Sequence, residues 1–358
     1  MKKVIFIILS ANNSHSRNRI VDFIEHGYDV EVYGFTRTNQ TKAVSLPYTV
    51  TILGTLTDKH YLGRIRLYIN GFLEFRGKYG PNDVVFYLEG LDVAMFFHSI
   101  NPMYKFIYEE YDLTHTYTRI KHVLEIIDKW IIKKSLITVT TSEGFIKFHF
   151  GAKKPNNVFL LENKLIPDII NHQIKKRKKF DKNHISIGFV GGPRFESVYN
   201  FIDVYCRNFP HHVFHIFGGP VPANFETLRK YNNCIFHSFF KNPDDLPEIY
   251  DKIDLVLSTY DVKFENVRYA EPNKLYESIF FETPIIVSSN TFLAEKVQRL
   301  KIGYDINAMD ENAIVKFIEQ LNENSILELA NNARKIDKQY TLNINTEFFS
   351  KLKEILYL

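Results

Sequence analysis

Residues 268–289, RYAEPNKLYESIFFETPIIVSS, carry the clearest indication of the fold of this chain. They predict a loop, a short helix and a buried strand in direct succession. Pro272 suits the first helical turn, because the N–H that proline lacks has no partner there. Apolar side chains then recur four residues apart and give the helix one apolar face: Leu275 with Ile279, and Tyr276 with Phe280. A helix that leads into such a strand indicates an α/β protein.

The start of this helix offers a site for an anion. The first-turn N–H groups around Asn273 and Lys274 have no intrahelical partner, and the lysine adds a full positive charge beside them. One turn later, Glu277 offers two acceptor oxygens that suit a vicinal diol such as a ribose. The pattern therefore predicts a phosphate site followed by a ribose site. An ordinary amphipathic helix with both charged side chains solvated is the alternative.

Length and composition limit the class of protein. With 358 residues the chain is too long for one typical domain, so we expect two. The two cysteines, Cys206 and Cys234, provide neither a disulfide framework nor a metal-ligand set, which favours a reducing cytoplasm. No stretch approaches the ~20 apolar residues that span a bilayer. The apolar run Val4–Leu9 is short and predicts a first strand rather than a signal peptide.

Strands and helices alternate along the chain, which predicts parallel sheets. The expected strands before the one in the opening stretch are Lys3–Ser10, Tyr28–Phe35, Val84–Leu88, Phe106–Glu110, Leu136–Ser142, Asn157–Glu162, His184–Val190, Val213–Gly218, Cys234–Phe239 and Asp254–Thr259. Residues 171–184, NHQIKKRKKFDKNH, lack apolar periodicity and favour an exposed basic linker. We therefore expect domains over residues 1–170 and 185–340. Residues 341–358 would form a terminal helix that could cross back to the first domain.

Positive charge is concentrated in the first half of the chain. Residues 1–184 carry 27 Lys and Arg against 18 Asp and Glu, and residues 185–358 carry 18 against 23. A basic first domain would suit an anionic membrane surface or a phosphate-bearing acceptor, whereas nucleic-acid binders usually show denser basic clusters. Charges scattered over solvated faces are the alternative.

Residues 61–79 predict an amphipathic helix that either packs on the sheet or lies on a membrane. We expect a cytoplasmic protein, with peripheral attachment to the cytoplasmic face of a membrane as an option and no nucleic-acid partner. The sequence predicts no particular oligomeric state.

Polar residues follow two expected strands of the first domain, where ligands of parallel sheets gather. The first set is Asn12, Asn13, His15 and Arg17, and the second is Asp112 and His115. These side chains could line an acceptor site, and a carboxylate or imidazole there could act as a base. A turn cap at Asp112 and a solvated His115 are the alternatives. Ser14 or Ser16 is expected to cap the following helix. No G-x-G-x-x-G occurs here, which argues against a dinucleotide cofactor.

A second phosphate-binding element follows the strand His184–Val190. Gly191 and Gly192 permit close approach of the backbone, and Arg194 can bind a phosphate through two parallel hydrogen bonds. Alone, this motif is weak. Arg268 could add a further positive charge.

Five segments together resemble the GT-B glycosyltransferases, particularly glycosyltransferase family four (glycosyl transferases group one). They are GFVGGPR (188–194), IDLVLSTYD (253–261), PNKLYESIFFETPIIVSS (272–289), FIYEEYDL (106–113) and LITVTTSE (136–143). The resemblance covers nearly the whole chain. It implies an α/β protein of GT-B fold, in which two Rossmann-like domains with parallel sheets face a central cleft.

The resemblance also implies an activity. The protein would move a sugar from a nucleotide-diphosphate donor, such as a UDP- or GDP-sugar, to a glycan or lipid-linked acceptor in surface polysaccharide or glycoconjugate synthesis. Glu277 would hold the donor ribose, and Arg194 and Lys274 would neutralise the diphosphate without a metal or another cofactor. Retention of anomeric configuration is expected, and Asp112 would matter more if the enzyme inverts.

The predicted site residues fall into three sets. The donor-binding set is Gly191, Gly192, Arg194, Arg268, Glu271, Asn273, Lys274 and Glu277. The catalytic set is Lys274, Arg194 and Asp112. The acceptor-binding set is Asn13, His15, Arg17 and His115. No metal ligands are predicted.

The chain departs from the family pattern at two places. Members usually carry two glutamates separated by seven residues, and here Tyr269 stands at the first position, with Glu271 nearby. A family variant with P-x-K before the second glutamate fits this chain better. Glu282 replaces the usual glycine at the end of the helix, and a left-handed backbone there would cost roughly 1 kcal/mol. We therefore predict a locally altered helix end.

Two other functions remain open on the same fold. One is a nucleotide-sugar epimerase or a sugar-releasing hydrolase, which needs its own acid and base and no acceptor. The other is a catalytically silent sugar- or nucleotide-binding partner, which the missing first glutamate favours. Fold analogy alone excludes neither.

Overall fold

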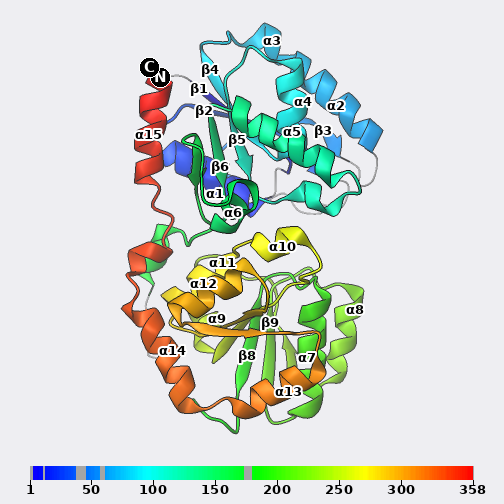
Figure 1. The fold of residues 1–358 in the computed structure, drawn as a ribbon, viewed down its shortest axis with the longest axis vertical. Helices are drawn as coiled ribbons and strands as arrows, with labels where there is room; N and C mark the ends of the chain where they lie inside the picture. Colours follow the sequence, from blue (N-terminus) through cyan, green and yellow to red (C-terminus); the bar gives the residue numbers. More distant parts are fainter. Residues whose placement is uncertain (1–2, 11–12, 38–45, 57–60, 173–179, 358) are drawn as a thin grey trace. The chain divides into compact units, whose positions relative to one another are not determined.

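The structure, a computed structural model, describes residues 3–10, 13–37, 46–56, 61–172 and 180–357. The chain divides into two compact units (Figure 1). The first comprises Met1–Leu161 and Asn345–Leu358, and the second comprises Glu162–Ile344. The division therefore falls at residue 162, whereas the sequence analysis ended the first domain at residue 170. Residues 173–179 of the predicted linker, and Asn12 of the predicted acceptor set, lie outside the described residues.

The first unit is built on a parallel sheet of seven strands in the order β3-β2-β1-β4-β5-β6-β7. The strands are β1 Lys3–Ile8, β2 Val30–Arg37, β3 Val50–Leu56, β4 Val84–Glu89, β5 Phe106–Glu110, β6 Ile137–Thr140 and β7 Val158–Leu160. The chain reverses its direction of travel across the sheet between β1 and β4. Ligands of open parallel sheets bind beyond the carboxyl ends of strands at such a point.

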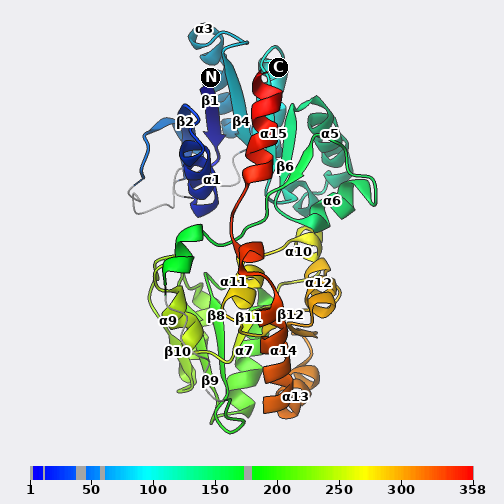
Figure 2. The same cartoon turned by 90° about the vertical axis from the view of Figure 1, so that its left-hand side faces the viewer.

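Helices cover both faces of this sheet (Figure 2). They are α1 Ser14–Glu25, α2 Tyr61–Leu73, α3 Phe75–Lys78, α4 Leu91–Ile100, η1 Thr114–Tyr117, α5 Lys121–Lys134, α6 Glu143–Phe150 and α15 Thr346–Tyr357. Helices α1 and α15 share a core on one face, where Phe349 meets Phe23 with ring centroids 5.0 Å apart. Helices α2 to α5 cover the other face. The terminal helix thus completes the core of the first unit.

The second unit has a parallel sheet of six strands in the order β10-β9-β8-β11-β12-β13. The strands are β8 Ser186–Val190, β9 Val213–Phe217, β10 Cys234–Phe236, β11 Leu255–Ser258, β12 Ile285–Ser288 and β13 Gly303–Ile306. Here the order reverses between β8 and β11. The loop after β8 and the segments after β11 are therefore the expected ligand-binding region of this unit.

Two apolar cores flank the second sheet. The helices are η2 Pro167–Asn171, α7 Glu196–Asn208, α8 Ala223–Glu226, η3 Thr227–Lys230, α9 Leu246–Asp251, α10 Glu265–Tyr269, α11 Asn273–Phe280, α12 Phe292–Leu300, α13 Glu311–Gln320, α14 Glu323–Lys335 and η4 Lys338–Thr341. Helix α11 contributes Leu275, Tyr276, Ile279 and Phe280 to the core that it shares with α9 and α12. The predicted apolar face of this helix is confirmed.

The eleven expected strands are all present, and two further strands were not predicted, β3 and β13. Both lie at an edge of their sheet. Only the last residue of each, Leu56 in β3 and Ile306 in β13, is buried, so neither has the buried apolar run that marks a strand in sequence. In the stretch 61–79, Tyr68, Phe72 and Phe75 are buried in the sheet core. Of the two alternatives for this stretch, packing on the sheet is therefore observed.

The prediction of an altered end for helix α11 is wrong. Glu282 has a φ of 56°, the left-handed conformation that glycine usually supplies. Thr283 N donates to Ser278 O at 2.9 Å and Glu282 N donates to Ile279 O at 3.2 Å, which is the ordinary termination. The Glu282 carboxylate also pairs with Arg334 at 2.8 Å and Lys338 at 3.3 Å. Side-chain pairing thus accompanies a strained backbone conformation.

Candidate functional site

The loop after β8 places two glycines at the switch point of the second sheet. Gly191 has a φ of 122°, which side chains rarely tolerate, and its N–H donates to Phe217 O at 2.8 Å. At Gly192, a Cβ atom would lie 3.2 Å from Gly219 O on the neighbouring loop. Gly191 is therefore favoured by its backbone conformation, and Gly192 by the close approach of the neighbouring loop.

Lys274, in the first turn of α11, approaches this loop. Its Nζ lies 3.7 Å from where a Cβ at Gly191 would stand, and 4.6 Å from the centroid of the Phe189 ring. The side chain is half-buried, and it forms no ion pair with any residue that the structure describes. A positive charge that is held in place and not neutralised is what a diphosphate site requires.

Glu277 lies one helical turn beyond Lys274 and is 4% exposed. Its Oε2 accepts a hydrogen bond from the Tyr250 hydroxyl at 2.7 Å, whereas Oε1 has no hydrogen-bond partner among the described residues. Burial raises the pKa of Glu277, and the Tyr250 hydrogen bond and the Lys274 charge oppose that rise. Tyr250 thus fixes one oxygen of the carboxylate and leaves the other for a ligand.

The start of helix α7 is occupied by a carboxylate of the chain itself. Asp261, which follows β11, accepts from Glu196 N at 3.2 Å and from Ser197 N at 2.8 Å. These first-turn N–H groups are therefore not available to a phosphate. Arg194, in the loop before the helix, is exposed and stacks on Phe195 at 5.0 Å. Sequence reasoning missed the role of Asp261, although its position at the end of a strand was a usable signal.

The other predicted donor residues have different surroundings. Asn273 is exposed at the start of α11. Arg268 is exposed and donates from Nε to Val262 O at 2.7 Å. Glu271 is only 3% exposed and pairs with Lys296 at 2.5 Å, which also contacts Glu162 at 3.0 Å. Glu271 is therefore part of a buried ion-pair network, and the structure does not bring it to the surface for a donor.

In the first unit, the predicted acceptor residues of α1 lie at its start. Asn13 caps the helix, because its side chain accepts from His15 N at 3.0 Å. The prediction that Ser14 or Ser16 is the cap was wrong. Ser16 instead donates from Oγ to Glu89 Oε2 at 2.6 Å, and the short Asn13 side chain is already in position. Arg17 is half-buried in the first turn.

A glutamate that sequence reasoning missed joins this region to β5. His15 Nε2 lies 3.1 Å from Glu109 Oε1, and Arg19 contacts the same oxygen from Nε and Nη2 at 3.1 and 3.0 Å. Burial opposes ionisation of Glu109, but Arg19 and His15 outweigh it and lower the pKa to about 2. Glu89, at the end of β4, is also fully buried, and burial together with the charge of Glu109 raises its pKa to about 7.

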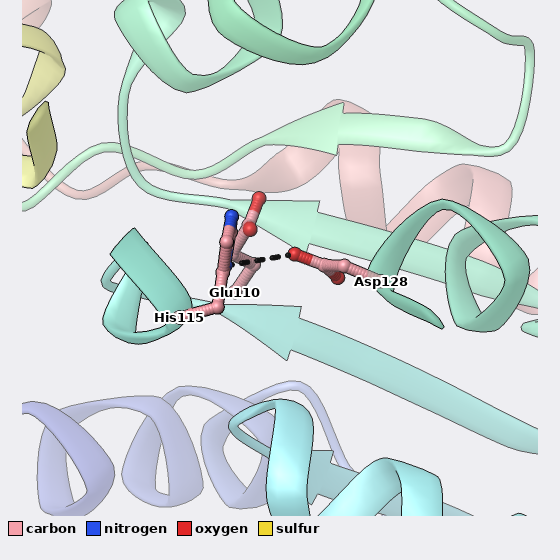
Figure 3. Close-up of side chains that lie close together, drawn as sticks. All are labelled: Glu110, His115 and Asp128. Carbon is pink, nitrogen blue, oxygen red and sulfur yellow. Dashed lines mark ion pairs between the residues drawn. The ribbon is translucent and has the colours of Figure 1, made fainter. Parts of the chain in front are cut away.

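The two residues of the second predicted acceptor set have different surroundings. Asp112 is half-buried in the loop after β5. His115 is only 3% exposed, and its Nδ1 lies 3.4 Å from Asp128 Oδ2 (Figure 3). Its ring faces α5 and not the solvent, so the structure removes His115 from the predicted acceptor site.

The comparisons with known proteins concern the fold. No protein-family model matches the sequence, and no curated protein sequence matches it. Three solved structures are similar over nearly the whole chain. Sucrose-phosphate synthase from Thermosynechococcus elongatus has a TM-score of 0.70 at 14% identity, with 99% of each chain covered. HepE of Anabaena, in complex with UDP and glucose, has a TM-score of 0.71 at 12% identity, covering 99% of this chain and 100% of that one.

The third is WaaG, a glycosyltransferase involved in lipopolysaccharide biosynthesis. It has a TM-score of 0.64 at 16% identity, with 94% of this chain and 97% of that chain covered. These similarities, together with the two parallel sheets, show that the chain has the GT-B fold.

Proposed function

We propose that this protein is a glycosyltransferase that moves a sugar from a nucleotide-diphosphate sugar to a glycan or lipid-linked acceptor. The observation that carries the proposal is the approach of the Lys274 ammonium to Gly191 at the switch point, with Glu277 one turn away. A fixed cation beside a close-passing backbone suits a diphosphate, and a carboxylate with one open oxygen suits a ribose. HepE was solved with UDP and glucose, so a UDP-sugar is the first donor to test.

In the proposed reaction, the bond between the anomeric carbon and the distal phosphate oxygen breaks. The acceptor hydroxyl oxygen bonds to that carbon, and its proton passes to the departing diphosphate oxygen. Negative charge builds up on the departing diphosphate, so positive groups bind the transition state more strongly than the ground state. Lys274 and Arg194 would supply that charge without a metal ion. We propose retention of configuration, and the Asp112 carboxylate would be the base if the reaction inverts.

The acceptor side of the proposal rests on the first unit. Asn13, His15 and Arg17 lie at the start of α1, next to the switch point of the first sheet. The excess of basic residues in 1–184 would suit a phosphate-bearing acceptor or an anionic surface. We therefore propose a role in surface polysaccharide or glycoconjugate synthesis, at the cytoplasmic face of a membrane. Among the helices that the structure describes, none has the length and apolar character to cross a bilayer.

The proposal is tested by nucleotide release from UDP- and GDP-sugars, with and without lipid-linked acceptors. Lys274→Ala and Glu277→Gln should each lower turnover by about 100-fold or more, because each removes a contact to the donor. Lys316→Ala and Glu319→Ala, which change exposed residues of α13, are the matched controls and should retain full turnover. Near-normal turnover in both site variants would reject the assignment.

The same assay separates the three functions. Acceptor-dependent release supports transfer. Release of free sugar or of an epimer without acceptor supports the hydrolase or epimerase, and donor binding without turnover supports a silent partner. Addition of Mg²⁺ or Mn²⁺ should leave the transfer rate unchanged.

A further inference from the structure

Four buried side chains from four elements meet at the carboxyl end of β5. They are Glu110 of β5, His115 of η1, Asp128 of α5 and His149 of α6, with exposed fractions of 2%, 3%, 0% and 9%. Figure 3 shows the first three lying close together. All belong to the first unit, whereas the proposed donor residues belong to the second.

Three contacts between their polar atoms are short enough for a shared small cation. His115 Nδ1 lies 3.4 Å from Asp128 Oδ2, and His149 Nε2 lies 3.7 Å from the same oxygen and 2.9 Å from Glu110 Oε1. Ligand atoms of Glu110, His115 and Asp128 all lie within 4.8 Å of one another. A tetrahedral Zn²⁺ with bonds of about 2.0–2.1 Å separates its ligands by about 3.3 Å. The observed separations lie on both sides of that value.

The cluster has the charge composition of a divalent cation site. Neither Glu110 nor Asp128 pairs with a lysine or an arginine among the described residues. Asp128 Oδ2 is fully buried and has no hydrogen-bond partner there, although it faces both imidazoles. Metal binding releases the protons of its ligands, and two carboxylates with two neutral imidazoles then carry a charge of −2, which a divalent ion cancels. Buried carboxylates without such compensation are costly.

The surroundings of the ligands agree with a metal site. Tyr108 donates its hydroxyl to Asp128 Oδ1 at 2.9 Å and so leaves Oδ2 directed at the imidazoles. Hydrogen bonds of this kind orient ligands around a bound metal. Two nitrogen and two oxygen ligands suit Zn²⁺, whereas Mg²⁺ and Ca²⁺ prefer six or more oxygens.

We propose that Glu110, His115, Asp128 and His149 form a structural Zn²⁺ site that ties η1, α5 and α6 to the end of β5. The ion would fix the loop that carries Asp112. It would stabilise the first unit and take no part in donor binding.

The first test uses the untagged full-length chain. After expression in zinc-supplemented medium, elemental analysis should find one Zn²⁺ per chain. Removal of the metal with a chelator should lower the melting temperature of the first unit by about 5 °C or more, and one equivalent of Zn²⁺ should restore it. Trp130 of α5 is the only tryptophan of the chain, so its fluorescence reports on this unit. A chain that holds no zinc and does not respond to it would overturn the proposal.

The second test separates a metal ligand from an ordinary buried acid. Asp128→Asn should abolish the stabilisation by Zn²⁺ but leave the melting temperature of the metal-free protein unchanged or higher, because a buried acid is removed. His122→Ala, on the exposed side of the same helix, should keep the full response to zinc. An equal zinc-dependent shift in Asp128→Asn and the parent chain would contradict the assignment.

A third measurement uses the parent chain alone and therefore does not depend on whether a substituted chain folds. Co²⁺ added to the metal-free parent chain should give the strong visible absorption of a four-coordinate site, and one equivalent of Zn²⁺ should remove it. A spectrum indistinguishable from Co²⁺ in buffer would also overturn the proposal.

Discussion

Glu109 and Glu110 are neighbours in β5 and are almost completely buried, yet their surroundings shift their pKa values in opposite directions. Side chains alternate along a strand, so the two carboxylates face opposite sides of the sheet. Glu109 faces α1, where Arg19 and His15 overcome burial and lower its pKa to about 2. Glu110 faces α5 and α6, where burial raises its pKa to about 7. The comparison shows that the side chains packed on each face of the sheet, and not local sequence, decide the charge state of a buried acid.

The largest expected effect comes from neutralising Glu109 in the metal-free protein, with the same change at Glu110 as the comparison. Glu109→Gln leaves the buried guanidinium of Arg19 without its nearest carboxylate. The other carboxylate, that of Asp22, lies 3.9 Å away. The Glu109→Gln substitution should lower the free energy of unfolding by about 3–5 kcal/mol. Glu110→Gln leaves no buried cation without a partner and should change the free energy of unfolding by about 1 kcal/mol or less. Urea unfolding followed by Trp130 fluorescence measures both.

Adding Arg19→Met to Glu109→Gln is the control, because it removes the stranded charge and should recover part of the loss. Equal losses for the two single variants would show that the opposite surroundings of these glutamates have no energetic consequence.

Glu89 sharpens the comparison, because it lies near Glu109 but its pKa is raised to about 7. A carboxyl group with a raised folded-state pKa stabilises the fold fully only below its unfolded value. That contribution is then lost as the pH rises from about 4.5 to above 7. Glu89→Gln should therefore gain stability relative to the parent chain between pH 5 and pH 8.5, by about 2 kcal/mol.

Thermal unfolding at the two pH values, again followed by Trp130, measures this gain. Ser16→Ala, which removes the hydroxyl that donates to Glu89, should lower stability more at pH 8.5 than at pH 5. A pH-independent difference between Glu89→Gln and the parent chain would mean that Glu89 does not titrate in this range.

The smallest effect is expected at Glu282, an unfavourably placed glutamate with exposed partners. Glycine at this position would relieve a left-handed backbone, worth roughly 1 kcal/mol, but it would lose the pairs with Arg334 and Lys338. Ion pairs with exposed partners contribute little. Glu282→Gly should therefore change the unfolding free energy by about 1 kcal/mol or less, measured by calorimetry of the second unit. A loss of several kcal/mol would show that these pairs are far stronger than exposed pairs usually are.

Much of the fold was predictable because its signals are local. Short runs of mainly apolar residues marked eleven strands, and the spacing of Leu275 and Ile279 marked the buried face of α11. The edge strands β3 and β13 were missed because they have no such run. The end of α11 was misjudged because a glutamate rarely adopts a positive φ.

The candidate site was predictable in part for the same reason. Lys274 and Glu277 are one turn apart on a single helix, so their relation follows from helical geometry. Their partners are far away in sequence: Tyr250 is 27 residues from Glu277 and comes from α9. The burial of Glu271 against Lys296 had no local signal either.

The sequence by itself determined which segments form strands and helices along the chain. It also determined the helix that carries Lys274 and Glu277, because both features depend on periodicities within a few residues. Only the tertiary structure decided which acid faces which base. Arg19 lies 90 residues from Glu109, and His149 lies 39 residues from Glu110, so the folding of the sheet brings each pair together. The state of a buried charge depends on atoms within a few ångströms, and in this protein those atoms come from distant parts of the chain.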